Sequence, residues 1–578
     1  MTWSALRPLP SLRVTGYRQI TNDGQQKQIA GTDGTSLYLN LFQPNRLGIV
    51  PVTDGAVTPL SIDMPWSGNR PRFIHGVSPD GAKLLVFSDV DAMSGNLWVV
   101  DPHGGGARFL AKGISYTAKS ATWSPDGGTV LYCTPHGELY TIPSEGGNPQ
   151  LFLMLASRAP AGTPFTVGDP VWSPDRSKIR FVRDGRYWEA TQGGKNVHEI
   201  LPNWHASNPK YGMCCGRWTP DGDFFLFVAA GAPYSQNPAA GRQIWALDER
   251  RSWLRHPSPD PIPLSNGPGF WGALEVSSDG KTVYSTALTS RGELVSYDAK
   301  SKQLVPYLGG ISAEQAAFSE DGKSLVYVTF PEGILWRANR DGSGLQQLTN
   351  GAMHPIDPHW SPDGTQILFY ETAASNPPAM YTVSSQGGTP RRLLPGDEDG
   401  ERANSWSPDG KEVAFVQLPR EATDPHAGAR IRILAIDTGR VTDLPQCPKS
   451  CRAPWWSPNG RYILGLTLDR DDLALFDFRT NHWSMLNLGL GGITSPTWSR
   501  DGNFIYFESS RSLKRKSTDP GVYRIRATGG RAESVLDLKG FKGTGVFGAW
   551  FGLDPDDTPL LLRDAGMNNV YALTLERK

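Results

Sequence analysis

The pentapeptide Trp-Ser-Pro-Asp-Gly occurs three times, at Trp123–Gly127, Trp360–Gly364 and Trp406–Gly410. In such a stretch proline presets φ for the first central position of a tight turn, Asp suits the second, and Gly accepts a left-handed exit. The Trp before the turn is large and flat, which suits the apolar layer between packed sheets. The motif therefore predicts a hairpin turn that follows a strand ending in a buried aromatic side chain.

Near copies of the pentapeptide return along the whole chain. Most neighbouring copies are separated by roughly 42–49 residues, which is the period of a four-stranded propeller blade. Two decayed copies, Gly31–Gly34 and Asp554–Asp557, bracket the set, so twelve units are expected. The near copies are Val77–Gly81, Trp172–Arg176, Trp218–Gly222, Val276–Gly280, Phe318–Gly322, Trp456–Gly460 and Trp498–Gly502.

Between the motifs the chain has the pattern of short strands. Alternating runs such as Lys83–Ser88 and Asn96–Val100 follow a motif, a Gly-rich turn such as Gly387–Gly388 comes next, and a last run such as Gln346–Thr349 closes the unit. Short alternating runs bounded by turn residues indicate strands. The fold class predicted is all-β, with tandem β-propellers built from four-stranded blades.

The two ends of the chain suggest how the rings close. Tyr17–Thr21 copies the outer strand of a unit, whereas only two strands, Pro559–Arg563 and Val570–Leu575, follow the last motif. Propellers usually have four to eight blades, so twelve units predict two rings. Six blades in each ring is the expected division, and seven plus five is the main alternative.

This division gives three segments. Residues 1–16 are expected to be an N-terminal tail or linker, 17–302 a first propeller, and 303–578 a second. Each half then begins with an outer strand that closes its own last blade and covers an exposed sheet edge.

The repeat is similar to that of the bacterial TolB family and its WD-repeat-like relatives. Further segments resemble the propeller region of bacterial winged-helix one-component regulators: Tyr17–Gly24, Thr32–Tyr38, Cys214–Gly216, Gly292–Ala299, Ile311–Glu314 and Pro559–Asp564. In that family a DNA-binding domain and one membrane span precede a propeller region outside the cytoplasm. The resemblance implies a sensor, and it implies a periplasmic or otherwise extracytoplasmic location. The given sequence contains neither of those parts, so it is expected to be either a stand-alone homologue or a chain whose N-terminal part is missing, and DNA binding is not carried over.

Charge and hydropathy exclude other classes. The 57 basic and 57 acidic side chains cancel, whereas nucleic-acid binders depend on an excess of basic groups. No window of about 18 apolar residues is present to span a membrane. Met1–Gly16 lacks the apolar core of a secretory signal, so a cytoplasmic location follows if the chain is complete.

No constellation predicts catalysis, a cofactor or a metal. A serine-hydrolase elbow, Gly-x-Ser-x-Gly, is lacking, and the ten histidines are scattered. Cys214 and Cys215 are expected to be buried structural cysteines rather than zinc ligands, which need four donors at suitable spacing. Cys447 and Cys451 could be bridged or free, because sequence does not report bridge geometry.

Residues just upstream of each motif are expected to line the central channels. The candidates for binding a ligand or partner are Lys119, Arg217, Asp357, Arg402, Asn404 and Arg452. The leading hypothesis is a non-enzymatic sensor module that recognises a protein or small ligand. The alternatives are a propeller-type polysaccharide lyase or hydrolase, and a scaffold in a cell-envelope complex.

Overall fold

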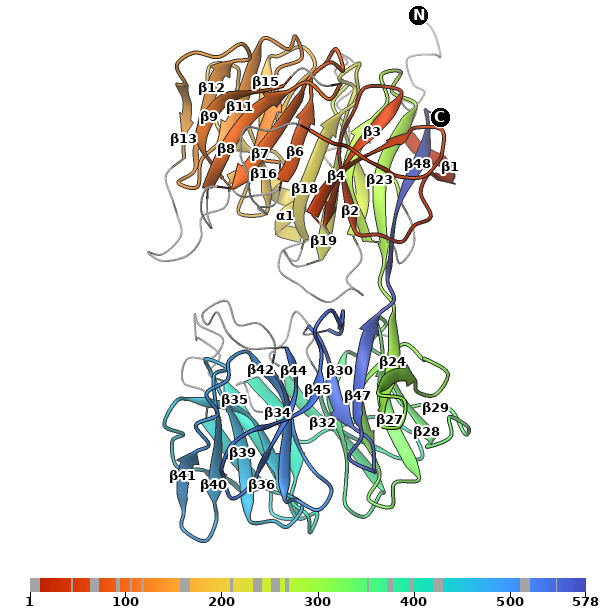
Figure 1. Cartoon of the computed structure of the whole chain (residues 1–578), viewed down its shortest axis with the longest axis vertical. Coiled ribbons are helices and arrows are strands. Elements are labelled where there is room, and N and C mark those ends of the chain that lie inside the picture. Colours follow the sequence, from red (N-terminus) through yellow and green to blue (C-terminus); the bar gives the residue numbers. More distant parts are fainter. Residues whose placement is uncertain are drawn as a thin grey trace, which may run out of the picture. The chain divides into compact units, whose positions relative to one another are not determined.

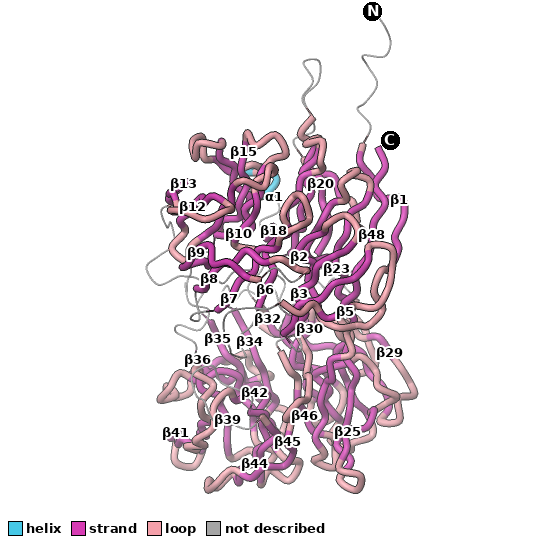
Figure 2. The backbone as a smooth tube through the Cα atoms, turned by 45° about the horizontal axis from the view of Figure 1, so that its top comes forward, coloured by secondary structure: helices cyan, strands magenta, loops and turns pink. Residues whose placement is uncertain are grey.

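The computed structural model is nearly all β-structure. It describes residues 11–42, 45–62, 72–89, 94–103, 106–115, 119–155, 167–207, 211–231, 242–250, 260–265, 270–350, 353–371, 378–394, 400–418, 430–509, 520–546 and 548–577. In these residues the one helix is the short α1 (Pro202–Ser207), and none is long and apolar enough to cross a membrane (Figure 2). The all-β prediction and its four-stranded repeat are confirmed.

The chain separates into two compact units. Of the described residues, the first unit holds those up to Gly231, 242–289 and 566–577, and the second holds 290–565. Six four-stranded blades can be traced in each unit from the described strands, with two blades of the first unit joined into one sheet by a single pairing between Arg242 and Phe270.

Each blade of the first unit runs from an innermost strand to an outermost strand. In that order the six blades are β2 (Lys27–Thr32), β3 (Ser36–Phe42), β4 (Asn45–Pro51) and β5 (Thr58–Pro59); β6 (Arg72–Val77), β7 (Leu84–Asp89), β8 (Ser94–Val100) and β9 (Ala107–Ser115); β10 (Ala121–Trp123), β11 (Thr129–Cys133), β12 (Glu138–Pro143) and β13 (Gln150–Met154); β14 (Val167–Trp172), β15 (Lys178–Arg183), β16 (Arg186–Thr191) and β17 (His198–Glu199); β18 (Tyr211–Trp218), β19 (Phe224–Gly231), β20 (Arg242–Asp248) and β21 (Ile262–Pro263); and β22 (Phe270–Val276), β23 (Thr282–Thr289), β48 (Met567–Arg577) and β1 (Leu12–Gln19).

The second unit is built in the same order. Its blades are β26 (Ala313–Phe318), β27 (Ser324–Thr329), β28 (Leu335–Asn339) and β29 (Gln346–Gln347); β30 (Pro355–Trp360), β31 (Gln366–Glu371), β32 (Ala379–Ser384) and β33 (Arg391–Arg392); β34 (Gly400–Trp406), β35 (Glu412–Leu418), β36 (Arg430–Ala435) and β37 (Val441–Asp443); β38 (Cys451–Trp456), β39 (Tyr462–Thr467), β40 (Leu473–Asp477) and β41 (His482–Met485); β42 (Ile493–Trp498), β43 (Phe504–Ser509), β44 (Gly521–Arg526) and β45 (Glu533–Asp537); and β46 (Phe551–Leu553), β47 (Pro559–Asp564), β24 (Gly292–Asp298) and β25 (Gln303–Pro306).

Contacts between innermost strands run around each unit. In the first unit β2, β6, β10, β14, β18 and β22 contact one another in turn, and β22 returns to β2. In the second unit β26 through β38 do the same, β42 contacts β46, and β46 returns to β26. The Trp498 indole on β42 donates to the carbonyl of Trp455 on β38 at 3.1 Å, which links the remaining pair.

The third strands of the two closing blades are exchanged relative to the sequence-based division. β48 pairs with both β1 and β23 in the first unit, whereas β24 pairs with β47 in the second (Figure 1). Residues 290–302 therefore belong to the second unit and 566–577 to the first, so a linear cut after Lys302 does not separate the units. The expected tail also ends earlier, because Leu12 is already paired in β1 and is buried.

The turn motif is held by one repeated hydrogen-bond pattern. At the Trp360–Gly364 copy, the Ser361 hydroxyl donates to Asp363 at 2.6 Å and accepts from the Gln366 N–H at 2.9 Å. The same Ser/Thr-to-Asp/Asn bond recurs in ten motif copies, from Ser78 to Ser499. These Asp side chains close hairpins rather than converge on one site.

The motif Trp side chains pack between neighbouring blades. Trp123 lies in one apolar cluster with Leu85 of β7 and Val130 of β11. In the second unit Trp498 clusters with Leu464 of β39 and Ile505 of β43. Burying large aromatic side chains this way removes much apolar area from water. The core is thus a set of apolar layers between blades.

Candidate functional site

A bulge interrupts the innermost strands a few residues before the motif. In β30 the pairing with β31 shifts between Ile356 and His359, and Asp357 takes a left-handed conformation with φ of 54°. A bulge sets two residues against one and re-aims the side chains beside it. Residues at the same place have positive φ in other blades: Asp169, Cys215, Gln315, Ala453 and Ser495. The bulges explain why residues upstream of each motif turn toward the ring centre.

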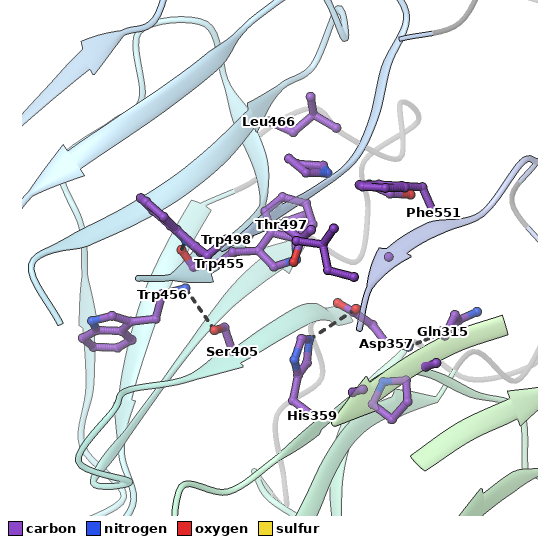
Figure 3. A pocket seen from close by; sticks show the side chains of 18 of the residues that line it. Gln315, Asp357, His359, Ser405, Trp455, Trp456, Leu466, Thr497, Trp498 and Phe551 are labelled. Carbon is purple, nitrogen blue, oxygen red and sulfur yellow. Dashed lines mark hydrogen bonds and ion pairs between the residues drawn. The ribbon is translucent and has the colours of Figure 1, made fainter. Parts of the chain in front are cut away.

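A cavity of about 1130 Å³ lies in the second unit (Figure 3). Its lining includes the bulge segments of β26, β30, β34, β38 and β42, together with residues from Val546 to Asp557. Ligand pockets usually measure about 300–1,000 Å³, so this cavity is large enough for an extended ligand.

Four arginines line this cavity: Arg500 donates to the backbone carbonyls of Glu320 and Pro555, and the other three have no carboxylate partner among the described residues. Arg402, Arg452 and Arg470 form no ion pair with any residue that the structure describes. Burial, together with the neighbouring Arg470 charge, lowers the pKa of Arg452 to about 10. The Nε of Arg402 is buried and lacks a hydrogen-bond partner in the described part of the chain. The three guanidinium groups are therefore available to an anion.

Aromatic side chains form another part of the cavity wall. Trp455, Trp456, Trp498, Trp550 and Phe551 all line it. The backbone N–H of Trp456 donates to the Ser405 hydroxyl at 3.0 Å, which ties β38 to β34. Bonds between blades hold this wall in place, and flat faces of this kind can stack on a ligand ring.

Acidic groups are also present, and Asp357 and Glu314 each have a local partner. Nε2 of His359 lies 3.3 Å from Oδ1 of Asp357, whose backbone N–H donates to Gln315 at 2.6 Å. Glu314 is buried and accepts the Val546 N–H at 3.0 and 3.2 Å. Burial raises the pKa of Glu314 to about 7, so part of its negative charge is removed near neutral pH.

The first unit gathers charges of both signs at its bulges. Lys119 and Arg217 both donate to Glu275, at 2.7 Å and at 2.8 and 3.0 Å. Asp169 lies 3.7 Å from the Arg217 guanidinium, and it accepts the Gly216 N–H at 2.8 Å and the Tyr187 hydroxyl. Burial raises the pKa of Asp169 to about 6. The four side chains satisfy one another and form a compact ion cluster.

The predicted channel residues thus fall into two groups. Lys119 and Arg217 meet in the ion cluster of the first unit. Asp357, Arg402 and Arg452 line the cavity of the second. The side chain of Asn404 lies outside the described residues. Their role in binding stays a prediction.

Several lining residues were missed by sequence reasoning. Arg470 belongs to the run Asp469–Asp472, which has the composition of a solvated loop tip. His359 directly precedes a motif Trp, and that position was a usable signal. In the sequence, Glu314 has no feature that separates it from other polar strand residues. Only its burial in the structure marks it as a lining residue of interest.

Four of the five cysteines are bridged in pairs. Cys214 is joined to Cys215 and Cys447 to Cys451, while Cys133 is free and buried. Both members of the first pair pack against an apolar core cluster but remain partly exposed, so they are less buried than expected. No group of three or more His, Cys, Asp or Glu side chains suited to a metal ion occurs in the described ranges.

A match to a family model supports the propeller repeat, and other known proteins show partial similarity. Residues 403–545 match the family model of the TolB beta propeller domain. Uncharacterized protein Atu1656 of Agrobacterium fabrum is 26% identical over 242 residues, which cover 40% of this chain and 78% of that protein. A solved structure of a TolB-type protein from Agrobacterium tumefaciens has a TM-score of 0.39 and 23% identity, and the match covers 48% of this chain and 99% of that one.

Other relatives correct the expectation that the chain is not an enzyme. Dipeptidyl-peptidase 5 of Porphyromonas gingivalis is 27% identical over 244 residues. That match spans 39% of this chain and 34% of the peptidase, so the chain covers about a third of that relative's length. A non-enzymatic assignment is therefore not tenable from the sequence alone, although these matches fix no activity. What they and the family model do support is a TolB-like β-propeller, matched directly at residues 403–545.

Proposed function

We propose that the second unit binds an anionic ligand in its central cavity. The observation that carries this proposal is the set of three guanidinium groups, Arg402, Arg452 and Arg470, that have no carboxylate partner among the described residues. Two of them lie close enough for one to lower the pKa of the other. Like charges held together at a partly buried site are relieved when a carboxylate or phosphate binds between them.

The remaining lining narrows the ligand to an extended acid with ring or hydroxyl groups. Trp455 and Trp550 offer flat apolar faces, and the Asp357–His359 pair can exchange hydrogen bonds with hydroxyl or amide groups. The volume of about 1130 Å³ exceeds what a single small metabolite fills. Acidic oligosaccharides and carboxylate-bearing peptides share this chemistry.

Calorimetric titration with oligouronides and with acidic peptides tests the proposal. Arg452→Gln is expected to weaken binding at least about tenfold, which corresponds to about 1.4 kcal/mol. Arg524→Gln is the matched control, because Arg524 lies outside the cavity and pairs with the exposed Glu533. An equal loss of affinity in both variants, or an unchanged affinity in Arg452→Gln, would contradict the proposal. Comparing the two ligand sets shows whether the acidic ligand is an oligosaccharide or a peptide.

We further propose that this binding serves as the input of a sensor outside the cytoplasm. The support is the TolB-like match and the presence of two disulfides, which persist in oxidising compartments. Trapping free thiols in intact cells before lysis tests the location. Finding Cys447 and Cys451 reduced in freshly trapped cells would contradict a location outside the cytoplasm.

A second candidate function is cleavage of the bound acid. The specific observation is the Asp357–His359 pair, which lies in the same cavity as the arginines. A carboxylate that orients a histidine is a common acid–base arrangement. In a lyase the arginines would neutralise the uronate carboxylate while His359 removes the adjacent proton. This function would be established if the protein forms products from oligouronides and if His359→Gln abolishes product formation but still binds the ligand. It would be rejected if the protein turns over none of the acids that it binds.

A further inference from the structure

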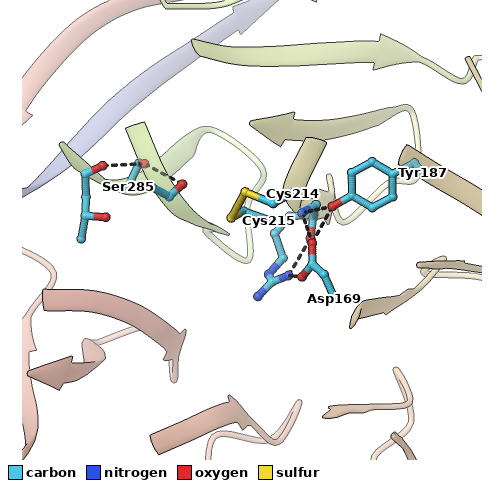
Figure 4. Close-up of a disulfide and its surroundings, with 9 residues drawn as sticks. Asp169, Tyr187, Cys214, Cys215 and Ser285 are labelled. Carbon is cyan, nitrogen blue, oxygen red and sulfur yellow. Dashed lines mark hydrogen bonds and ion pairs between the residues drawn. A yellow bond between two sulfur atoms is a disulfide. The ribbon is translucent and has the colours of Figure 1, made fainter. Parts of the chain in front are cut away.

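The first unit contains a disulfide between neighbouring residues. Cys214 and Cys215 are bridged on the innermost strand β18, beside Asp169 and Tyr187 (Figure 4). The bridge lies at the bulge of that strand, where the pairing with β19 shifts between Cys214 and Arg217. Cys215 has a φ of 64° at this point.

The bulge does not depend on the bridge. The corresponding positions in other blades hold Asp169, Gln315, Asp357 and Ala453, and each has a φ between 50° and 55° without a cysteine. The backbone shape is therefore a property of the repeat. The two sulfur atoms add chemistry to β18 that its fold does not require.

A bridge between neighbours also adds little to stability. Disulfides stabilise mainly by restricting the unfolded chain, and the effect grows with the length of the closed loop. A link between residues 214 and 215 closes the shortest loop that two residues can form. By this argument the bridge does not serve as a structural staple.

The two bridges of the chain differ in access. Cys214 and Cys215 are both partly exposed, whereas Cys447 and Cys451 are buried, at 8% and 3%. Thiol–disulfide exchange needs direct approach of a thiolate to one sulfur atom. The partly exposed pair is thus more accessible to a small thiol in the folded protein than the buried pair is.

The surroundings of the pair are held in place independently of the sulfur atoms. Gly216 follows the bridge, and its N–H donates to Asp169 at 2.8 Å and to the Tyr187 hydroxyl at 2.6 Å. A side chain at Gly216 would collide with Tyr187, since an added Cβ would lie 2.6 Å from that hydroxyl oxygen. Arg217, next along the strand, is fixed by Glu275. Opening the bridge therefore leaves two thiols on an ordered strand.

We propose that Cys214–Cys215 is a reversible thiol–disulfide exchange site in the first unit, opened by small-molecule thiols. A thiolate attacks one sulfur atom, the S–S bond breaks, and a mixed disulfide forms while the other cysteine leaves as a thiolate and takes up a proton. A second thiol then attacks the mixed disulfide. It releases the oxidised small-molecule disulfide and the second cysteine thiol. Two thiols are oxidised, and one protein disulfide is reduced to two thiols.

Graded reduction of the full chain tests the site. The folded protein is treated with rising dithiothreitol, alkylated under native conditions and mapped by mass spectrometry. Cys214 and Cys215 are expected to become labelled at a lower reductant concentration than Cys447 and Cys451, while Cys133 stays unlabelled. Labelling of the 447–451 pair first, or no labelling of 214 and 215 before the protein unfolds, overturns the proposal.

A second measurement separates an exchange site from a structural bridge. The double variant Cys214→Ser, Cys215→Ser is expected to melt within about 2 °C of the parent protein, since the bulge stands without sulfur. Cys447→Ser, Cys451→Ser is the matched comparison and is expected to lower the melting temperature more. A larger loss in the 214–215 variant would mark that bridge as structural and overturn the proposal.

Discussion

Arg217 donates two hydrogen bonds to a single oxygen of Glu275, from Nε at 3.0 Å and from Nη2 at 2.8 Å. Lys119 reaches the same oxygen at 2.7 Å, so one carboxylate compensates two cations from different blades. Burial raises the pKa of Glu275, and Arg217 opposes that shift. The contact links strands that are far apart in the chain and makes Glu275 the centre of the ion cluster.

Replacing Glu275 with Gln should destabilise the first unit strongly. The change leaves Lys119 and Arg217 facing each other at a partly buried site, and breaking such a pair costs about 3–5 kcal/mol. Glu576→Gln is the control, because its pair with Arg13 is exposed and worth at most about 1 kcal/mol. Urea unfolding at pH 8 measures both variants. Similar losses of unfolding free energy in the two variants would show that the ion cluster stabilises the protein no more than an exposed ion pair does.

The channel positions could be predicted because each bulge precedes a motif that is visible in the sequence. Asp357, Arg402 and Arg452 were found this way, and all three line one cavity. Arg470 could not be found by that rule, because it lies in the turn between β39 and β40 and approaches the cavity only once the blades are packed.

The exchange of third strands was beyond sequence reasoning for a different physical reason. The segments that form β24 and β48 are both strands that follow the hairpin of a blade's two inner strands. Either could complete either closing blade by its pattern alone. The choice depends on long-range pairing, in which Thr282–Thr289 runs against Met567–Thr574.

This exchange predicts how fragments of the chain behave. A chain of residues 11–302 lacks β48, which pairs with both β1 and β23, and should therefore show no cooperative unfolding. Residues 11–289 joined by a flexible linker to 566–577 should restore a cooperative transition. Thermal unfolding followed by circular dichroism distinguishes the two fragments. A cooperative transition in the 11–302 fragment would support the linear division instead.

A single hydroxyl in the turn motif should have a measurable effect on stability. Ser361 is buried and holds both the Asp363 carboxylate and the Gln366 N–H. Ser361→Ala leaves these groups without that partner and should cost about 1–2 kcal/mol. Ser301→Ala removes a hydroxyl from an exposed turn, where it donates to Asp298, and should cost less. Chemical denaturation of both variants tests the difference, and a larger loss at Ser301 would contradict this account of the motif.

The same bond predicts a loss of stability in acid. Hydrogen bonding by Ser361 holds the pKa of Asp363 below its ordinary value of 3.8. The charged form is favoured in the folded state, so this contribution is complete above about pH 4 and is lost as the pH falls through the folded pKa. Ser361→Ala should therefore reduce the dependence of unfolding free energy on pH below 4. If the pH dependence of the unfolding free energy below pH 4 is unchanged in Ser361→Ala, other carboxylates must cause it.

Glu314 should give the opposite dependence at higher pH. Its pKa is raised to about 7 by burial, from an ordinary value near 4.5, so the folded state holds a proton that the unfolded state has released. Stability from this group is therefore greatest below pH 4.5, falls as the pH rises toward 7, and is level above it. The total fall is on the order of 3–4 kcal/mol. Glu314→Gln should reduce the slope of the profile between pH 5 and 7.5 without removing it, because burial also raises the pKa of Glu508 to about 7 and that of Asp169 to about 6. Glu533→Gln, at an exposed pair with Arg524, should leave the slope intact. Unfolding free energies at four or five pH values decide the matter, and a profile that stays equally steep in Glu314→Gln would rule out Glu314 as its source.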